Sequence, residues 1–199
     1  SGMSREFAHC GVSFKPAYYN QLKAVDACVK WFYAVQPAIK QNTVAVTFGS
    51  SVDSATQFYV VKGVNNTAPI YQKLSTDGTA DPSITFEDLP IGSLVLDAIN
   101  HQGDDITVGA GQTERMNVTS GSGGTLHSHA SSNEAGSTST IADTTMSWTR
   151  DTNTGSAMQS ALAIQPQRRS CIKTVGDTPD APVFDTISDS LEQTSASHS

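Results

Sequence analysis

Two histidines and two aspartates are the residues in this sequence whose types and spacing best suit metal chemistry. His127 and His129 stand two positions apart, so an extended segment places both imidazoles on one side. Either Glu134 or the pair Asp104 and Asp105 could complete the site with carboxylate oxygens. Those aspartates together with Asp97 would instead suit calcium, which prefers several oxygen ligands. We expect no obligatory cofactor; the alternatives are a structural calcium ion, an adventitious divalent metal, or solvated histidines beside an ordinary acidic turn.

A second group of residues suits sugar binding. Exposed tyrosines stack on sugar rings while amide side chains bind hydroxyl groups. The sequence offers this combination in a loop-like stretch that contains Tyr18, Tyr19, Asn20 and Gln21. Carboxylates such as Glu87 and Asp88 could also serve as an acid/base couple for glycoside cleavage. However, no G-x-S-x-G or comparable nucleophile motif is present, so we expect no enzymatic activity.

Composition narrows the class of protein. The 199 residues include 19 acidic and 12 basic ones, for a formal net charge of -7, and only 16% are charged. Nucleic-acid binding needs a basic face, which this sequence does not supply, so we expect no nucleic-acid partner. No apolar run approaches the roughly 20 residues of a membrane span.

The elements that must position these residues are strands. Alternation of polar and apolar residues, and β-branched runs bounded by turn residues, predict strands over 44–48, 58–61, 83–87, 94–99, 144–149 and 157–164, with another from about Ala27. Met146 and Trp148 fall on one face of their strand, and Trp31 and Trp148 are expected in the core. In contrast, residues 120–140 are rich in Gly, Ser and Thr, which predicts a long exposed loop.

The two ends differ from the middle. Ser1 and Gly2 before Met3 are typical of tag removal, and residues 1–6 are an N-terminal lead without a secretory signal. The last 30 residues carry five acidic residues and one Lys, so they supply -4 of the total charge. Such a segment is typically irregular on its own, but Val183, Phe184 and Ile187 alternate well enough to add a strand to an open sheet edge. Cys10, Cys28 and Cys171 cannot all pair within one chain.

An ordered set of motifs covers residues 7–166. The motifs lie at 31–37, 42–48, 63–70, 109–117, 120–123, 135–138, 144–149 and 161–166. In this order they resemble jelly-roll-type β-sandwich domains of bacterial and archaeal surface proteins and of phage or viral structural proteins. The resemblance implies a non-catalytic module and carries over no catalytic residue. Relatives generally have one or two strands before the segment that matches residues 7–14, so we expect the tail, or a neighbouring subunit's tail, to fill an open edge.

These observations together predict an all-β, jelly-roll-like antiparallel sandwich over 7–166 with an acidic extension over 167–199. The predicted function is that of a structural or adhesive module on a virion or cell surface. Its expected partners are copies of itself or other surface or virion proteins. A carbohydrate-binding module is the alternative, and a glycan-acting hydrolase is third.

Overall fold

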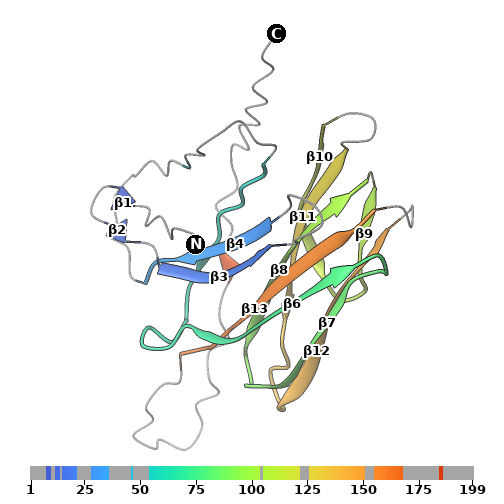
Figure 1. The fold of residues 1–199 in the computed structure, drawn as a ribbon. Helices are drawn as coiled ribbons and strands as arrows, with labels where there is room; N and C mark the ends of the chain where they lie inside the picture. Colours follow the sequence, from blue (N-terminus) through green and yellow to red (C-terminus); the bar gives the residue numbers. More distant parts are fainter. Residues whose placement is uncertain are drawn as a thin grey trace, which may run out of the picture.

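The computed structural model describes residues 8–9, 12–13, 15–21, 28–35, 46, 54–103, 105–121, 126–150, 155–167 and 184–185. Of 8–9, 12–13, 15–21, 28 and 184–185 only the backbone is described. None of these residues lies in a helix, and every pair of strands is antiparallel (Figure 1). The strands are β1 (Ala8–His9), β2 (Val12–Ser13), β3 (Lys15–Gln21), β4 (Cys28–Tyr33), β5 (Val60–Val61), β6 (Ile70–Gly78), β7 (Ser83–Leu89), β8 (Leu94–Gln102), β9 (Ile106–Val108), β10 (Thr113–Ser120), β11 (His127–Ala135), β12 (Ala142–Arg150), β13 (Ala157–Ile164) and β14 (Phe184–Asp185). The all-β prediction is therefore confirmed.

Two sheets form the centre of the molecule. The larger has the strand order β10-β11-β8-β13-β6, and the smaller has the order β7-β12-β9. Three two-stranded pairs, β1–β2, β3–β4 and β5–β14, complete the pairing. Neighbours in the five-stranded sheet are mostly distant in the sequence, which is typical of antiparallel sheets whose connections cross to a second sheet.

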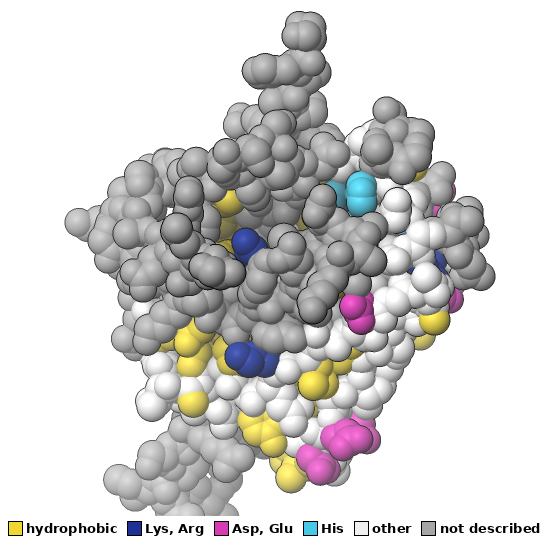
Figure 2. Space-filling model, in the orientation of Figure 1, with side chains coloured by type: hydrophobic (Ala, Val, Ile, Leu, Met, Phe, Trp, Pro, Cys, Tyr) yellow, Lys and Arg dark blue, Asp and Glu magenta, His cyan; other side chains and the backbone are white. Residues whose placement is uncertain are grey.

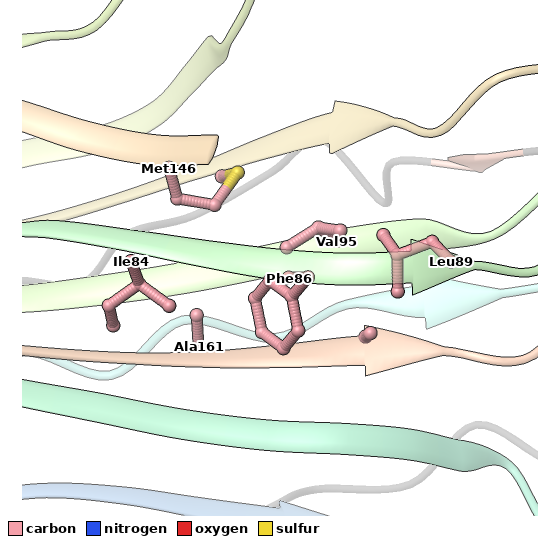
Figure 3. Packing of buried hydrophobic residues seen from close by; sticks show 7 residues of the cluster. Ile84, Phe86, Leu89, Val95, Met146 and Ala161 are labelled. Atoms are coloured by element: carbon pink, nitrogen blue, oxygen red, sulfur yellow. The ribbon is translucent and has the colours of Figure 1, made fainter. Parts of the chain in front are cut away.

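The space between the two sheets holds the main core. Ile84 and Phe86 of β7 and Met146 of β12 pack against Val95 of β8 and Ala161 of β13 (Figure 3). Along β7 the burial alternates strictly from Ser83 to Glu87, as the period-two pattern predicts. Trp148 is 1% exposed and packs in the adjoining cluster, which confirms its predicted core position.

The opposite face of the five-stranded sheet is also covered. Val29 and Trp31 of β4 pack on Met158, and Trp31 donates a hydrogen bond from Nε1 to Ser160 Oγ at 3.1 Å. Beside them, Tyr59, Val61 and Val64 pack on a cluster formed by Leu94, Leu96 and Ile164. This second coverage explains why every residue of β13 is buried, the even-numbered stripe as well as the alanines on the other face.

Three sequence predictions need correction or lie outside the description. Residues 120–140 do not form one long loop, because β11 occupies residues 127–135 in the interior of the larger sheet. The strand predicted over 58–61 is confined to Val60–Val61. The strand predicted over 44–48 lies outside the described residues except for Val46, which belongs to no strand.

Candidate functional site

The structure brings the two predicted metal-binding histidines together. His127 and His129 lie on β11 with ring centroids 6.3 Å apart and ring planes inclined by 21°. Nε2 of His129 lies 3.0 Å from Ser120 Oγ on the neighbouring strand β10. His129 is 8% exposed, so it belongs to the covered part of the sheet and not to a solvated loop.

The structure describes only one of the two aspartates that were predicted beside the histidines. Asp104 lies outside the described residues, and Asp105 is exposed, with a left-handed φ of 25°. Asp97 is fully buried, and its oxygens accept hydrogen bonds from Ser132 and Trp148. A structural calcium ion stays a prediction. Within the described part of the chain, no three His, Cys, Asp or Glu side chains are placed to hold one metal ion. A metal bound by His127 and His129 stays a prediction.

The predicted sugar-binding residues are in a strand. Tyr18, Tyr19, Asn20 and Gln21 all belong to β3, which pairs with β4, so this stretch is not a loop. Their side chains lie outside the described atoms. The sugar-binding role therefore stays a prediction.

The tail residue Phe184 also lies in a strand. Phe184 and Asp185 form β14 and pair with Val61 and Val60 of β5, respectively. Val183 and Ile187 are outside the described residues. Residues 184–185 and 60–61 are far apart in the sequence, so this pairing connects the acidic extension to the layer that covers the larger sheet.

A buried polar network, which the sequence reasoning missed, joins both sheets around Asp97. The Asp97 carboxylate accepts hydrogen bonds from the backbone N of Ser132 at 3.0 Å and from its Oγ at 2.5 Å. Trp148 Nε1 and Gln159 Nε2 each donate to the other carboxylate oxygen at 2.7 Å. The signal in the sequence was a single carboxylate inside the apolar run 94–99, where a charged residue needs buried partners.

The network continues through an amide on the β9–β10 connection. Gln112 donates from Nε2 to Ser132 Oγ at 2.7 Å and accepts from the backbone N of Ser147, also at 2.7 Å. Burial raises the pKa of Asp97, and the hydrogen bonds from Ser132, Gln159 and Trp148 partly offset that rise. A hydrogen-bonded carboxylate and hydroxyl suggest hydrolytic chemistry, but the side chains of Asp97 and Ser132 are 0% exposed and no substrate can reach them. The network is structural.

The surface feature best placed for recognition is the strand β6 at one edge of the five-stranded sheet. From Gly78 to Gln72, β6 pairs with β13 in seven consecutive register positions, and the register shifts only near Ile70. No described strand pairs with the other side of β6. Tyr71 and Leu74 on this strand are 41% and 37% exposed. Figure 2 shows the face that carries β6, where hydrophobic side chains are mixed with charged ones.

The remaining edges of the two central sheets are less suited to pairing. The register of β10 is interrupted between Glu114 and Met116, and Asn117 of this strand donates from Nδ2 to Ile106 O of β9 at 3.0 Å. On β7, Asp88 has a left-handed φ of 52°. Bulges and irregular backbone protect sheet edges against strand addition. The long regular edge is therefore β6.

Comparisons with known proteins add no relative: no protein family, curated protein or solved structure matches this chain. The described residues include no helix that is long and apolar enough to cross a lipid bilayer.

Proposed function

We propose that this chain is a non-enzymatic structural module with a jelly-roll-like sandwich, displayed on a virion or cell surface, and that it acts through assembly contacts. The observation that carries the proposal is the edge strand β6. It is nine residues long, keeps a regular register over seven of them, and exposes two large apolar side chains. Regular edges of this length are templates for strand addition by another chain.

The burial of the larger sheet supports the same function. One face packs on β7, β12 and β9, and part of the other is covered by β4 and the segment around β5. A sheet with both faces occupied gains further contacts through its edges. The strand pairing between β14 and β5 is a second example of a short segment added to this architecture.

The test is the mass of the full chain in solution. We expect sedimentation equilibrium to show a dimer or larger assembly whose fraction increases with protein concentration. A chain that stays monomeric at every concentration, and also with the other proteins of its particle or surface, would contradict the proposal. A glycan-array signal that is lost in Tyr18→Ala and Tyr19→Ala variants would instead establish the carbohydrate-binding alternative.

A further inference from the structure

A hydroxyl, a carboxylate and a side-chain amide meet at the open end of the β10–β11 hairpin. Ser132 Oγ donates to Asp97 Oδ1 at 2.5 Å and accepts from Gln112 Nε2 at 2.7 Å. We propose that the Ser132 hydroxyl attacks the side-chain amide of Gln112, with Asp97 as the base, and that an ester bond then joins the two side chains. The inference goes beyond the proposed function and does not depend on it. Because the reaction occurs once within each chain, its product is a cross-linked module and not an enzyme.

Asp97 is placed to take the proton of the Ser132 hydroxyl. Its Oδ1 accepts the hydrogen bond from that hydroxyl, while Trp148 and Gln159 donate to Oδ2 and fix the orientation of the carboxylate. Burial raises the pKa of Asp97, and a carboxylate with a raised pKa is a stronger base than an exposed one. A serine hydroxyl becomes a competent nucleophile when an adjacent base takes its proton.

The Gln112 amide is held in one orientation with its carbonyl polarised. Its Oε1 accepts from the backbone N of Ser147 at 2.7 Å, and this donor assigns Nε2 to the side of Ser132 Oγ. The carbonyl carbon Cδ is one covalent bond beyond Nε2, and rotation about the Cγ–Cδ bond turns its face towards Ser132 Oγ. The N–H of Ser147 is a donor of the kind that stabilises the negative charge developing on Oε1 during the attack.

Glycine at position 109 leaves the space in which this amide lies. A Cβ at Gly109 would lie 2.7 Å from Gln112 Oε1 and 2.8 Å from the backbone O of Ser147, closer than real Cβ contacts. The backbone N of Gly109 donates to the same Ser147 O at 2.9 Å, which joins the segment before β10 to β12. The β9–β10 connection thus seats the Gln112 side chain between Ser147 of β12 and Ser132 of β11.

The step exchanges an amide for an ester and balances in atoms. The bond between Ser132 Oγ and Gln112 Cδ forms, and the Cδ–Nε2 bond breaks. Asp97 takes the hydroxyl proton and returns it to Nε2, which leaves as ammonia. The reacting amide belongs to the same chain, so the burial that excludes an external substrate does not prevent the step. Gln112 is half-buried, which lets ammonia leave to solvent, whereas Ser132 and Asp97 are 0% exposed, which protects the ester from water.

The test is the intact mass of the folded full chain after incubation at neutral pH. Loss of ammonia is expected to lower the mass by about 17 Da relative to the sequence. Trypsin releases the peptides 74–115 and 116–150, because it cleaves after Lys and Arg. Gln112 is in the first peptide and Ser132 in the second, so the ester keeps the two joined. Alkali in denaturant is expected to hydrolyse the ester, which separates the peptides and leaves a carboxylate, about 1 Da heavier, in place of the Gln112 amide.

Variants identify the reacting groups. Ser132→Ala and Gln112→Ala each remove one partner of the bond and are expected to show the full mass of their sequences. Asp97→Asn removes the base and is expected to do the same. Ser131→Ala changes the neighbouring serine, which lies on the opposite face of β11 and contacts Tyr59, and this matched control is expected to keep the loss of about 17 Da. Circular dichroism of each variant confirms that it folds.

Each result decides one part of the proposal. A folded parent chain with the full mass of its sequence would overturn the ester. A loss of ammonia that persists in Ser132→Ala or Gln112→Ala would assign it to another amide and would overturn the ester equally. A folded Asp97→Asn variant that still forms the cross-link would overturn the role of Asp97 as the base. The assembly in solution is measured separately, so failure of the ester leaves the proposed function standing.

Discussion

At the scale of single residues, Asp97 is the most constrained polar group in the described part of the chain. Its two oxygens receive four hydrogen bonds, from Ser132, Trp148 and Gln159, which come from β11, β12 and β13. The side chain is 0% exposed, so no water replaces a lost partner. One carboxylate therefore fixes the relative position of three strands in two sheets.

Asp97→Asn is expected to lower the free energy of unfolding by about 3 kcal/mol, because the introduced NH₂ would face donors and leave buried groups without acceptors. The measurement is urea-induced unfolding followed by fluorescence. Glu87→Gln, an exposed substitution on β7, is the control and should change the stability by less than about 0.5 kcal/mol. Equal stability of the Asp97→Asn variant and the parent would show that the network contributes nothing.

Tyr59 gives the fold a dependence on alkaline pH. It donates from its hydroxyl to Ser131 Oγ at 2.8 Å, and desolvation by burial raises its pKa from 10.0 to about 12. The folded state therefore retains the phenolic proton between pH 10 and 12 while the unfolded chain loses it. The stabilisation is fully present below pH 10 and is lost as the pH rises towards 12, with a total of roughly 2–3 kcal/mol.

The measurement is the free energy of unfolding as a function of pH from 9 to 12 in the parent and in Tyr59→Phe. We expect the parent to lose stability over this interval by the stated amount relative to the variant, which has no hydroxyl at this position. Tyr71→Phe, on the exposed part of β6, is the control and should follow the parent. Parallel pH profiles of Tyr59→Phe and the parent would contradict the assignment.

At the scale of elements, one arginine connects two turns at the end of the smaller sheet. The Arg150 side chain is 0% exposed; it donates from Nη1 to Gly155 O at 3.1 Å and from Nη2 to Thr79 O. Its backbone N and Nε both donate to Asp81 Oδ1, at 3.2 and 3.4 Å. The β6–β7 and β12–β13 connections are thus held by the same side chain.

Arg150→Ala is expected to destabilise the fold by about 3–4 kcal/mol, because two turn carbonyls lose their donor, the Asp81 carboxylate keeps only the backbone donor of residue 150, and a cavity forms. Asp81→Asn is the matched comparison. Since the Asp81 side chain is 48% exposed, its substitution should cost about 1 kcal/mol or less. Chemical denaturation provides both values; similar losses in the two variants would show that the ion pair, and not the carbonyl contacts, provides the stability.

The strands that the sequence predicted correctly are those whose own residues show an apolar run or a polar/apolar alternation. β7, β8, β12 and β13 are apolar or alternate, and each was predicted to within a few residues. β11 could not be found in this way, because it buries Ser128, Ser131, Ser132 and Asn133. Their partners include Asp97, Tyr59 and Gly103 O, which lie 25 to 72 residues away. A polar strand is stable in the core only when such distant groups satisfy it, and local patterning does not report that.

In the candidate site, too, local spacing predicts some features while others depend on residues that are distant in the sequence. The shared face of His127 and His129 follows from their spacing alone, and the structure places the two rings together. The position of β6 at the edge of the larger sheet depends on strand order, which pairs β6 with β13 and with no other described strand. Strand order is a property of long-range pairing, so no single segment of the sequence contained it.

At the scale of the whole molecule, the acidic extension and the covering layer form one connected feature. β14 pairs with β5, and Val61 of β5 packs on the cluster that contains Leu94, Leu96 and Ile164 of the larger sheet. Among the described residues, β14 is joined to the central sheet through β5, a strand of two residues. Loss of β14 leaves the backbone of β5 without its strand partner and reduces the cover on that cluster.

Deletion of residues 170–199 is expected to lower the free energy of unfolding by roughly 1–2 kcal/mol, because the ladder between β14 and β5 is lost. The measurements are the midpoint of thermal unfolding and the mass in solution. A shorter deletion of residues 188–199 keeps β14 and is the matched control, expected to melt like the parent. If β14 pairs with β5 of the same chain, the long deletion lowers the melting midpoint and leaves the number of chains per particle unchanged. If β14 is exchanged between copies, the deletion lowers both the melting midpoint and the number of chains per particle. Identical melting and mass after both deletions would show that the extension contributes to neither the fold nor its assembly.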